Sequence, residues 1–92
     1  MTENCINIKI DPEQVAHTLR QEAVEQLAGA GNEVLLDFGA VPRIDANAIR
    51  ALEELAGLAD DRSVRVVLRA VNMDIYRVLK LMNLAARFRF VS

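Results

Sequence analysis

The chain has 92 residues, of which 52% are apolar and 26% charged, so it belongs to the folded rather than the disordered class and predicts one domain over residues 1–92. The net charge of −2 hides an asymmetry. Residues 1–61 carry four basic and twelve acidic residues, whereas residues 62–92 carry seven basic and one acidic. Two interpretations stay open: the charges compensate across one fold, or they form a polarised surface for a charged partner.

Single-residue counts restrict the chemistry further. The lone cysteine, Cys5, excludes an internal disulfide and a cysteine-based metal cluster. The only histidine, His17, has no H-x-x-E or H-x-x-x-D spacing around it, so we expect no metal site and an exposed position in the first helix. Neither an apolar run of about 18 residues nor a signal-peptide pattern occurs. These features predict a cytoplasmic protein with a reduced thiol and no direct membrane insertion.

The first third of the chain predicts a strand and a helix. Residues 6–10 (INIKI) alternate between apolar and polar, which indicates a strand with one buried face. Asp11 is a suitable N-cap and Pro12 suits the first helical position, so we expect a helix to begin here and to end at Gly29 to Gly31. Its buried side recurs in steps of four residues: Val15, Leu19, Ala23 and Leu27.

The middle of the chain repeats this pattern. Residues 33–39 (EVLLDFG) predict a second strand, and a helix is expected from about Ala46 to Ala59. The strand buries Val34, Leu36 and Phe38, the helix buries Ile49, Leu52, Leu55, Ala56 and Ala59, and its solvent side carries Arg50, Glu53 and Glu54.

The last third predicts a strand, a helix and a short strand. Residues 64–71 (VRVVLRAV) place Arg65, Val67 and Arg69 opposite the aliphatic face. Asn72 or Asp74 is expected to cap a helix that ends at Asn83 in the left-handed conformation. Its predicted inner side is Ile75, Val78, Leu79 and Met82, and a final strand alternates Phe88 and Phe90 with Arg87 and Arg89.

This order of strands and helices implies an α/β fold with right-handed parallel crossovers. A parallel sheet covered on both faces reads as continuous apolar runs, but here polar residues share one face: Lys9, Asp37, Arg65, Arg69, Arg87 and Arg89. We therefore expect a two-layer open sheet of about four mainly parallel strands with three helices on one face. The other face is interpreted as solvated or self-associating, which leaves a homodimer open. Nucleic acid is not expected, because that face lacks stacking aromatics and the isoelectric point is acidic.

The sequence contains no arrangement that predicts catalysis. Paired carboxylates, Ser/His and Cys/His constellations and a phosphate-binding Gly-rich loop are missing, and Gly29 to Gly31 precedes a strand instead of following one. We therefore expect a protein that is not an enzyme and has no cofactor.

The segment LLDFGAVPRIDANAIRAL resembles the signature of STAS domains, the fold of anti-sigma factor antagonists and of the cytoplasmic tails of sulfate transporters. In that family a strand of the form V-x-L-D-L precedes a loop, an Asp, Ser or Thr residues with Gly, and a helix. Residues 34–38 match the strand, residues 41–45 the approach to the loop, and residues 49–55 the helix. VRVVLRAVNMDIYRVLKLMNLAARF is similar to the closing strand and helix, so the resemblance covers about residues 30–92.

Two features depart from the family pattern. Members usually begin with an additional N-terminal strand, and this chain has room for only one strand there. Phospho-regulated antagonists resemble D-S-[ST]-G at the loop, but here Ala46, Asn47 and Ala48 follow Asp45. Ala46 therefore stands at a lost phospho-acceptor position, and the four Ser and Thr residues of the chain lie elsewhere: Thr2, Thr18, Ser63 and Ser92.

The resemblance implies a regulatory interaction module. Its docking edge would be the loop and following helix, with Ile44, Asp45, Ala46, Asn47, Ala48, Arg50 and Glu54 as candidate partner-binding residues. Asp45 can cap the helix by accepting from Asn47 or Ala48, and it can also offer its charge to a partner. The implied partner is an anti-sigma factor of the serine-kinase type. The alternative is the ATPase of a lipid-trafficking ABC transporter, beside which small STAS proteins occur, because VNMDIYRVLKLMNL is similar to a helix of those subunits.

Overall fold

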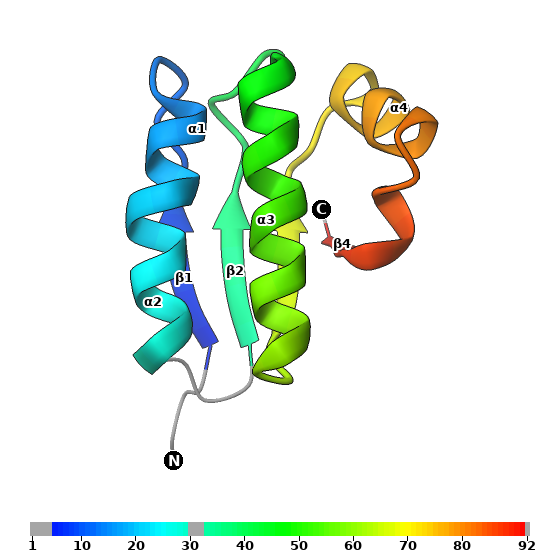
Figure 1. The fold of residues 1–92 in the computed structure, drawn as a ribbon. Helices are drawn as coiled ribbons and strands as arrows, with labels where there is room; N and C mark the ends of the chain where they lie inside the picture. Colours follow the sequence, from blue (N-terminus) through cyan, green and yellow to red (C-terminus); the bar gives the residue numbers. More distant parts are fainter. Residues whose placement is uncertain (1–4, 30–32, 92) are drawn as a thin grey trace.

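The computed structural model describes residues 5–29 and 33–91, which form one four-stranded sheet with helices on one face. The strands β1 (Cys5–Lys9), β2 (Glu33–Asp37), β3 (Arg65–Arg69) and β4 (Arg89–Val91) are all parallel and lie in the order β1-β2-β3-β4. The arrows of β1, β2 and β3 point the same way behind the helices (Figure 1). Each crossover therefore steps in the same direction, and this confirms the expected two-layer α/β architecture.

The first helix is continuous but changes its winding. It consists of α1 (Val15–Thr18), a π-helical turn η1 (Leu19–Ala23) and α2 (Val24–Gly29). An α-helix turns about 100° per residue, so three steps of four residues would separate Val15 from Leu27 by about 120° around the axis. The wider π turn takes up one surplus residue and removes most of that rotation. All four residues of the predicted stripe are buried as a result: Val15, Leu19, Ala23 and Leu27.

The predicted start of this helix at Asp11 and Pro12 is wrong. The Asp11 carboxylate accepts a hydrogen bond from the Glu13 N–H at 2.9 Å, and the Gln14 N–H donates to the Asp11 carbonyl at 3.1 Å. Asp11 therefore closes a turn through its side chain instead of capping a helix, and the helix begins only at Val15. The helix ends at Gly29, and Gly31 lies outside the described residues.

The two remaining long helices follow the prediction more closely. Helix α3 (Ala46–Asp61) packs beside the first helix, and α4 (Met73–Leu81) begins at Asn72. Asn72, and not Asp74, is the N-cap, and Asn83 adopts the left-handed conformation with φ 61°. Met82 was expected inside but is 48% exposed, because it follows the last turn of α4.

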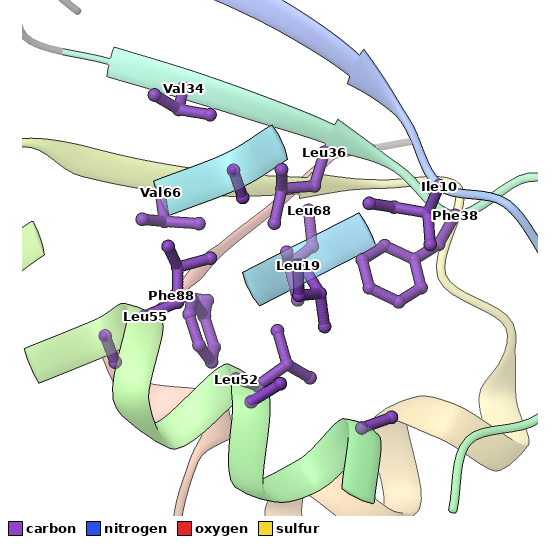
Figure 2. Close-up of a cluster of buried hydrophobic side chains, with 14 of the residues drawn as sticks. Ile10, Leu19, Val34, Leu36, Phe38, Leu52, Leu55, Val66, Leu68 and Phe88 are labelled. Atoms are coloured by element: carbon purple, nitrogen blue, oxygen red, sulfur yellow. The ribbon is translucent and has the colours of Figure 1, made fainter. Parts of the chain in front are cut away.

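The core lies between the sheet and the helix layer. Ile10, Val34, Leu36, Phe38, Val66 and Leu68 project from the sheet towards Leu19, Leu52 and Leu55, as Figure 2 shows. Each of these side chains is at most 5% exposed, so the predicted aliphatic faces are confirmed. Phe88 closes the same cluster from the segment before β4.

The face opposite the helices differs from the prediction in two ways. Val67 lies there in register with Leu35 and Arg89, yet it is only 4% exposed; Arg65 and Arg69 lie two residues away on either side of it in β3. Arg87 is not on this face, because it belongs to the 3₁₀ turn η2 (Ala85–Arg87). The open face therefore has an apolar centre with a polar margin.

Candidate partner-binding site

The loop after β2 is fixed at both ends by its own residues. The Asp37 carboxylate accepts from the Gly39 N–H at 2.8 Å, and a Cβ on Gly39 would approach that oxygen to 3.0 Å, which favours glycine here. Val41 donates its N–H to the Phe38 carbonyl at 3.0 Å and is buried, and Ile44 is half-buried. Between these anchors the chain is held with Pro42 and Arg43 in solvent.

Asn72 connects this loop to α4. Its side-chain oxygen accepts from the Ile75 N–H at 2.8 Å and so caps α4. Its side-chain nitrogen donates to the Pro42 carbonyl at 2.9 Å. The sequence predicts the cap but not the bond to Pro42, because a local motif does not reveal a contact with a residue thirty positions away. The chain before Asp45 is therefore held by the residue that caps α4.

Asp45 has the geometry of an N-cap. Its backbone is extended, with φ −108° and ψ −176°, and its carboxylate accepts from the Ala48 N–H at 2.9 Å. Of the two predicted donors, Asn47 and Ala48, it is the Ala48 N–H that bonds to Asp45. The Ala48 side chain is buried at 1% exposure, so it contributes to the core and the cap and not to the surface. One carboxylate oxygen of Asp45 remains available beside the exposed Ala46 and Asn47.

The candidate residues form a continuous exposed edge. Asp45, Ala46, Asn47, Arg50 and Glu54 are exposed, and they run from the loop along the first turns of α3. Glu54 forms an ion pair of 3.2 Å with Arg20 of η1, so its carboxylate is already engaged within the chain. Asp45 and Arg50 form no ion pair with another described residue.

A groove adjoins this edge on the side of the first helix. Its volume is about 490 Å³, and it is lined by Pro12, Gln14, Val15, Ala16, His17, Arg43, Ile44, Asp45 and Asn47. The start of α1 forms the wall opposite the loop, and the sequence does not predict this wall. His17 is exposed as predicted and faces this groove. The parallel topology explains the juxtaposition, because the loops after β1 and β2 leave the same edge of the sheet.

The hydroxyl side chains described by the structure lie away from this edge or inside the fold. Thr18 is 3% exposed and donates its hydroxyl to the Gln14 carbonyl at 2.8 Å. Ser63 lies between α3 and β3, at the opposite edge of the sheet from Asp45. Thr2 and Ser92 fall outside the described residues. The described part of the loop therefore offers no hydroxyl next to Asp45.

The charge asymmetry of the sequence is largely compensated within the fold. Of the four ion pairs among the described residues, three join an acidic residue before position 62 to a basic residue after it: Glu33–Arg65, Asp37–Arg69 and Asp60–Arg87. Their distances are 3.7, 3.7 and 2.7 Å. These ion pairs support the interpretation that the charges compensate within one fold, and not that they form a polarised surface. Each exposed pair contributes at most about 1 kcal/mol.

Within residues 5–29 and 33–91 no three His, Cys, Asp or Glu side chains gather as metal ligands. Nor does any helix of these ranges have the length and apolar character needed to cross a membrane.

Comparisons with known proteins agree with this architecture. The family model described as "Mlab, STAS domain" matches residues 10–91. A crystal structure and an NMR structure of TM1081 from Thermotoga maritima, provisionally described as an anti-sigma factor antagonist, both superpose with a TM-score of 0.81. They share 18% and 17% identity with this chain, and the matches cover all of it and 82% and 77% of their own chains. At such identities the likeness shows the fold alone. No curated protein matches significantly. Since the family model spans nearly the whole sequence, the chain belongs to the STAS domain family.

Proposed function

We propose that this protein is a non-enzymatic regulatory module that binds a protein partner through the edge from Ile44 to Asn47 and through Arg50 and Glu54. The observation that carries the proposal is the preorganised loop: Asp45 is fixed as a cap, and Asn72 ties the preceding turn to α4. A surface held in one conformation loses little entropy when a partner binds. The residues of this edge include no constellation that predicts catalysis, so we propose recognition rather than catalysis.

The partner we favour is an anti-sigma factor of the serine-kinase type, with the protein acting in the bacterial cytoplasm to regulate transcription. This proposal relies on the resemblance of the loop and helix to anti-sigma factor antagonists. Since Ala46 occupies the acceptor position, we propose that binding is constitutive or set by abundance and is not controlled by phosphate at this loop.

A second candidate partner is the ATPase subunit of a lipid-trafficking ABC transporter. The observation that favours it is the family model itself, whose description is "Mlab, STAS domain". In that case α4 would be the contact. Tyr76 of α4 packs its ring edge-on against Phe90 at 5.1 Å, in agreement with a structural role for that ring.

The deciding experiment is affinity purification of the tagged protein from its own host, with mass spectrometry of the copurifying proteins. A serine-kinase-type ATPase supports the regulatory proposal, whereas an ABC-transporter ATPase with membrane proteins supports the second candidate. Recovery of neither, at any salt concentration that preserves the fold, would contradict both.

Variants of Asp45 then test whether the edge is the contact. Asp45→Asn keeps a side-chain acceptor for the Ala48 N–H but removes the charge, whereas Asp45→Ala removes both. We expect both variants to weaken binding of the captured partner, and only Asp45→Ala to lower the melting temperature. If Asp45→Asn binds like the unmodified protein, Asp45 serves only as a helix cap.

A further inference from the structure

Exposed apolar side chains gather on α4. Met73 is 66% exposed and Leu81 is 79% exposed, and they lie two turns apart on the same side of the helix. Arg77 lies between them on this side, and Lys80 lies next to it. Ile75 and Leu79 are buried on the opposite side, so the exposed face is not needed for the packing of α4 in its own fold. We call the side chains of Met73, Arg77, Lys80 and Leu81 the α4 face.

The α4 face combines apolar surface with uncompensated positive charge. Arg77 and Lys80 form no ion pair with any other residue that the structure describes. A surface that covers this face must therefore offer apolar contact for Met73 and Leu81 and carboxylates for the two cations.

The outer side of α3 has this composition. Glu53, Gly57 and Asp61 follow one another at four-residue spacing, with Glu54 and Leu58 beside them, and these five residues line a shallow hollow of about 570 Å³. A Cβ built on Gly57 would meet nothing within 4 Å, so the hollow is open above this residue. Glycine is a poor residue for the interior of a helix, and no neighbour in this fold requires it here. We call these five residues the α3 hollow.

The two surfaces match in length and in charge. Each spans eight residue steps of a helix, or about 12 Å. Glu53 and Asp61 form no ion pair within the described residues, which leaves two carboxylates for two cations. Gly57 provides the space into which Met73 or Leu81 could insert, and Leu58 provides apolar contact.

We propose that the α4 face of one copy of this protein docks into the α3 hollow of a second copy. The α4 face and the α3 hollow each lie opposite the buried residues of their own helix, where a second copy can reach them. Arg77 and Lys80 of one copy then lie against Glu53 and Asp61 of the other. The α3 hollow begins at Glu53, less than one turn beyond Arg50, and it shares Glu54 with the edge assigned to the protein partner.

The test is sedimentation velocity of the purified chain at low salt, from micromolar concentrations up to about 1 mM. We expect concentration-dependent association that weakens as salt is added. One charge-reversed variant carries Arg77→Glu with Lys80→Glu, and the other carries Glu53→Lys with Asp61→Lys. Each should be monomeric alone, because its two faces carry charges of the same sign. A mixture of the two should associate, because each face then meets an opposite charge on the other variant.

Two controls separate docking from loss of folding. Glu22→Lys with Glu25→Lys gives the same net charge as the acidic-to-basic variant but changes exposed residues of η1 and α2, so association should persist. Gly57→Gln fills the hollow with a good helix former, and it should weaken association about ten-fold or more while circular dichroism is kept and the melting temperature does not fall. A monomer over the whole range, or association that neither reversal weakens, would overturn the proposal and leave the α4 face to a different protein.

Discussion

Replacement of Asn72 should destabilise the fold by removing two separable contributions, the cap of α4 and the tie to the loop. Asn72→Ala removes the cap of α4, the 2.8 Å bond from the Ile75 N–H, which costs about 1 kcal/mol. It also removes the 2.9 Å bond to the Pro42 carbonyl, which we discount to about 0.5–1 kcal/mol because water can replace it at this exposed site. The expected loss of unfolding free energy is therefore about 1.5–2 kcal/mol.

Asn72→Asp separates the two contributions. The carboxylate still accepts from the Ile75 N–H and suits the positive end of the helix, so the cap is kept. It cannot donate to the Pro42 carbonyl, so only the tie is lost. We expect this variant to lose about 0.5–1 kcal/mol, roughly half the effect of Asn72→Ala.

The measurement is urea unfolding monitored by circular dichroism. An unchanged m-value would show that the variants and the unmodified protein expose the same surface on unfolding. At about 4–8 °C per kcal/mol for a domain of this size, Asn72→Ala should lower the melting temperature by about 6–16 °C. A loss below about 0.5 kcal/mol for Asn72→Ala would refute the reasoning. Equal losses for both variants would show that the tie, and not the cap, provides the stability.

Three further predictions concern single positions. Gly57→Ala should raise the unfolding free energy by about 1 kcal/mol in urea titrations, because its Cβ meets open space, and a decrease would show a packing role for the glycine. Leu79→Ala should cost about 2–5 kcal/mol in the same assay and Met82→Ala less than about 0.5, and similar losses would contradict the burial difference between them. The unmodified protein should gain no phosphate from an anti-sigma factor kinase with ATP, whereas Ala46→Ser should gain one by intact-mass spectrometry; phosphate on the unmodified chain would contradict the lost acceptor.

The strands and the buried sides of the helices could be predicted because alternation and helical periodicity are local properties of the sequence. The same patterns failed where a side chain has a partner that the local pattern does not indicate. Asp11 looked like a cap but accepts from Glu13 in a turn, and Arg87 continued the alternation of the last strand but pairs with Asp60 from a 3₁₀ turn. In each case the residue type alone did not indicate the partner that the side chain has in the structure.

The candidate site was predictable in its loop but not in its surroundings. Asp45 as a cap followed from the residue type and its place before an apolar-periodic helix. The tie from Asn72 and the groove wall from α1 depend on which loops share a sheet edge, and a single sequence does not give those distances. Val67 was also missed, since it stays buried on the open face with no helix over it.

The π turn in the first helix has a consequence for how this gene can change length. Because η1 contains one residue more than an α-helical turn needs, deletion of a single codon for an exposed residue such as Gln21 would leave an ordinary α-helix with Val15 and Leu27 still on one side. The same deletion at Arg50 would rotate the rest of α3 by about 100° and turn its apolar side out of the core. The first helix can therefore lose one residue and keep its buried side, whereas the number of residues in α3 is fixed by the packing of its apolar side.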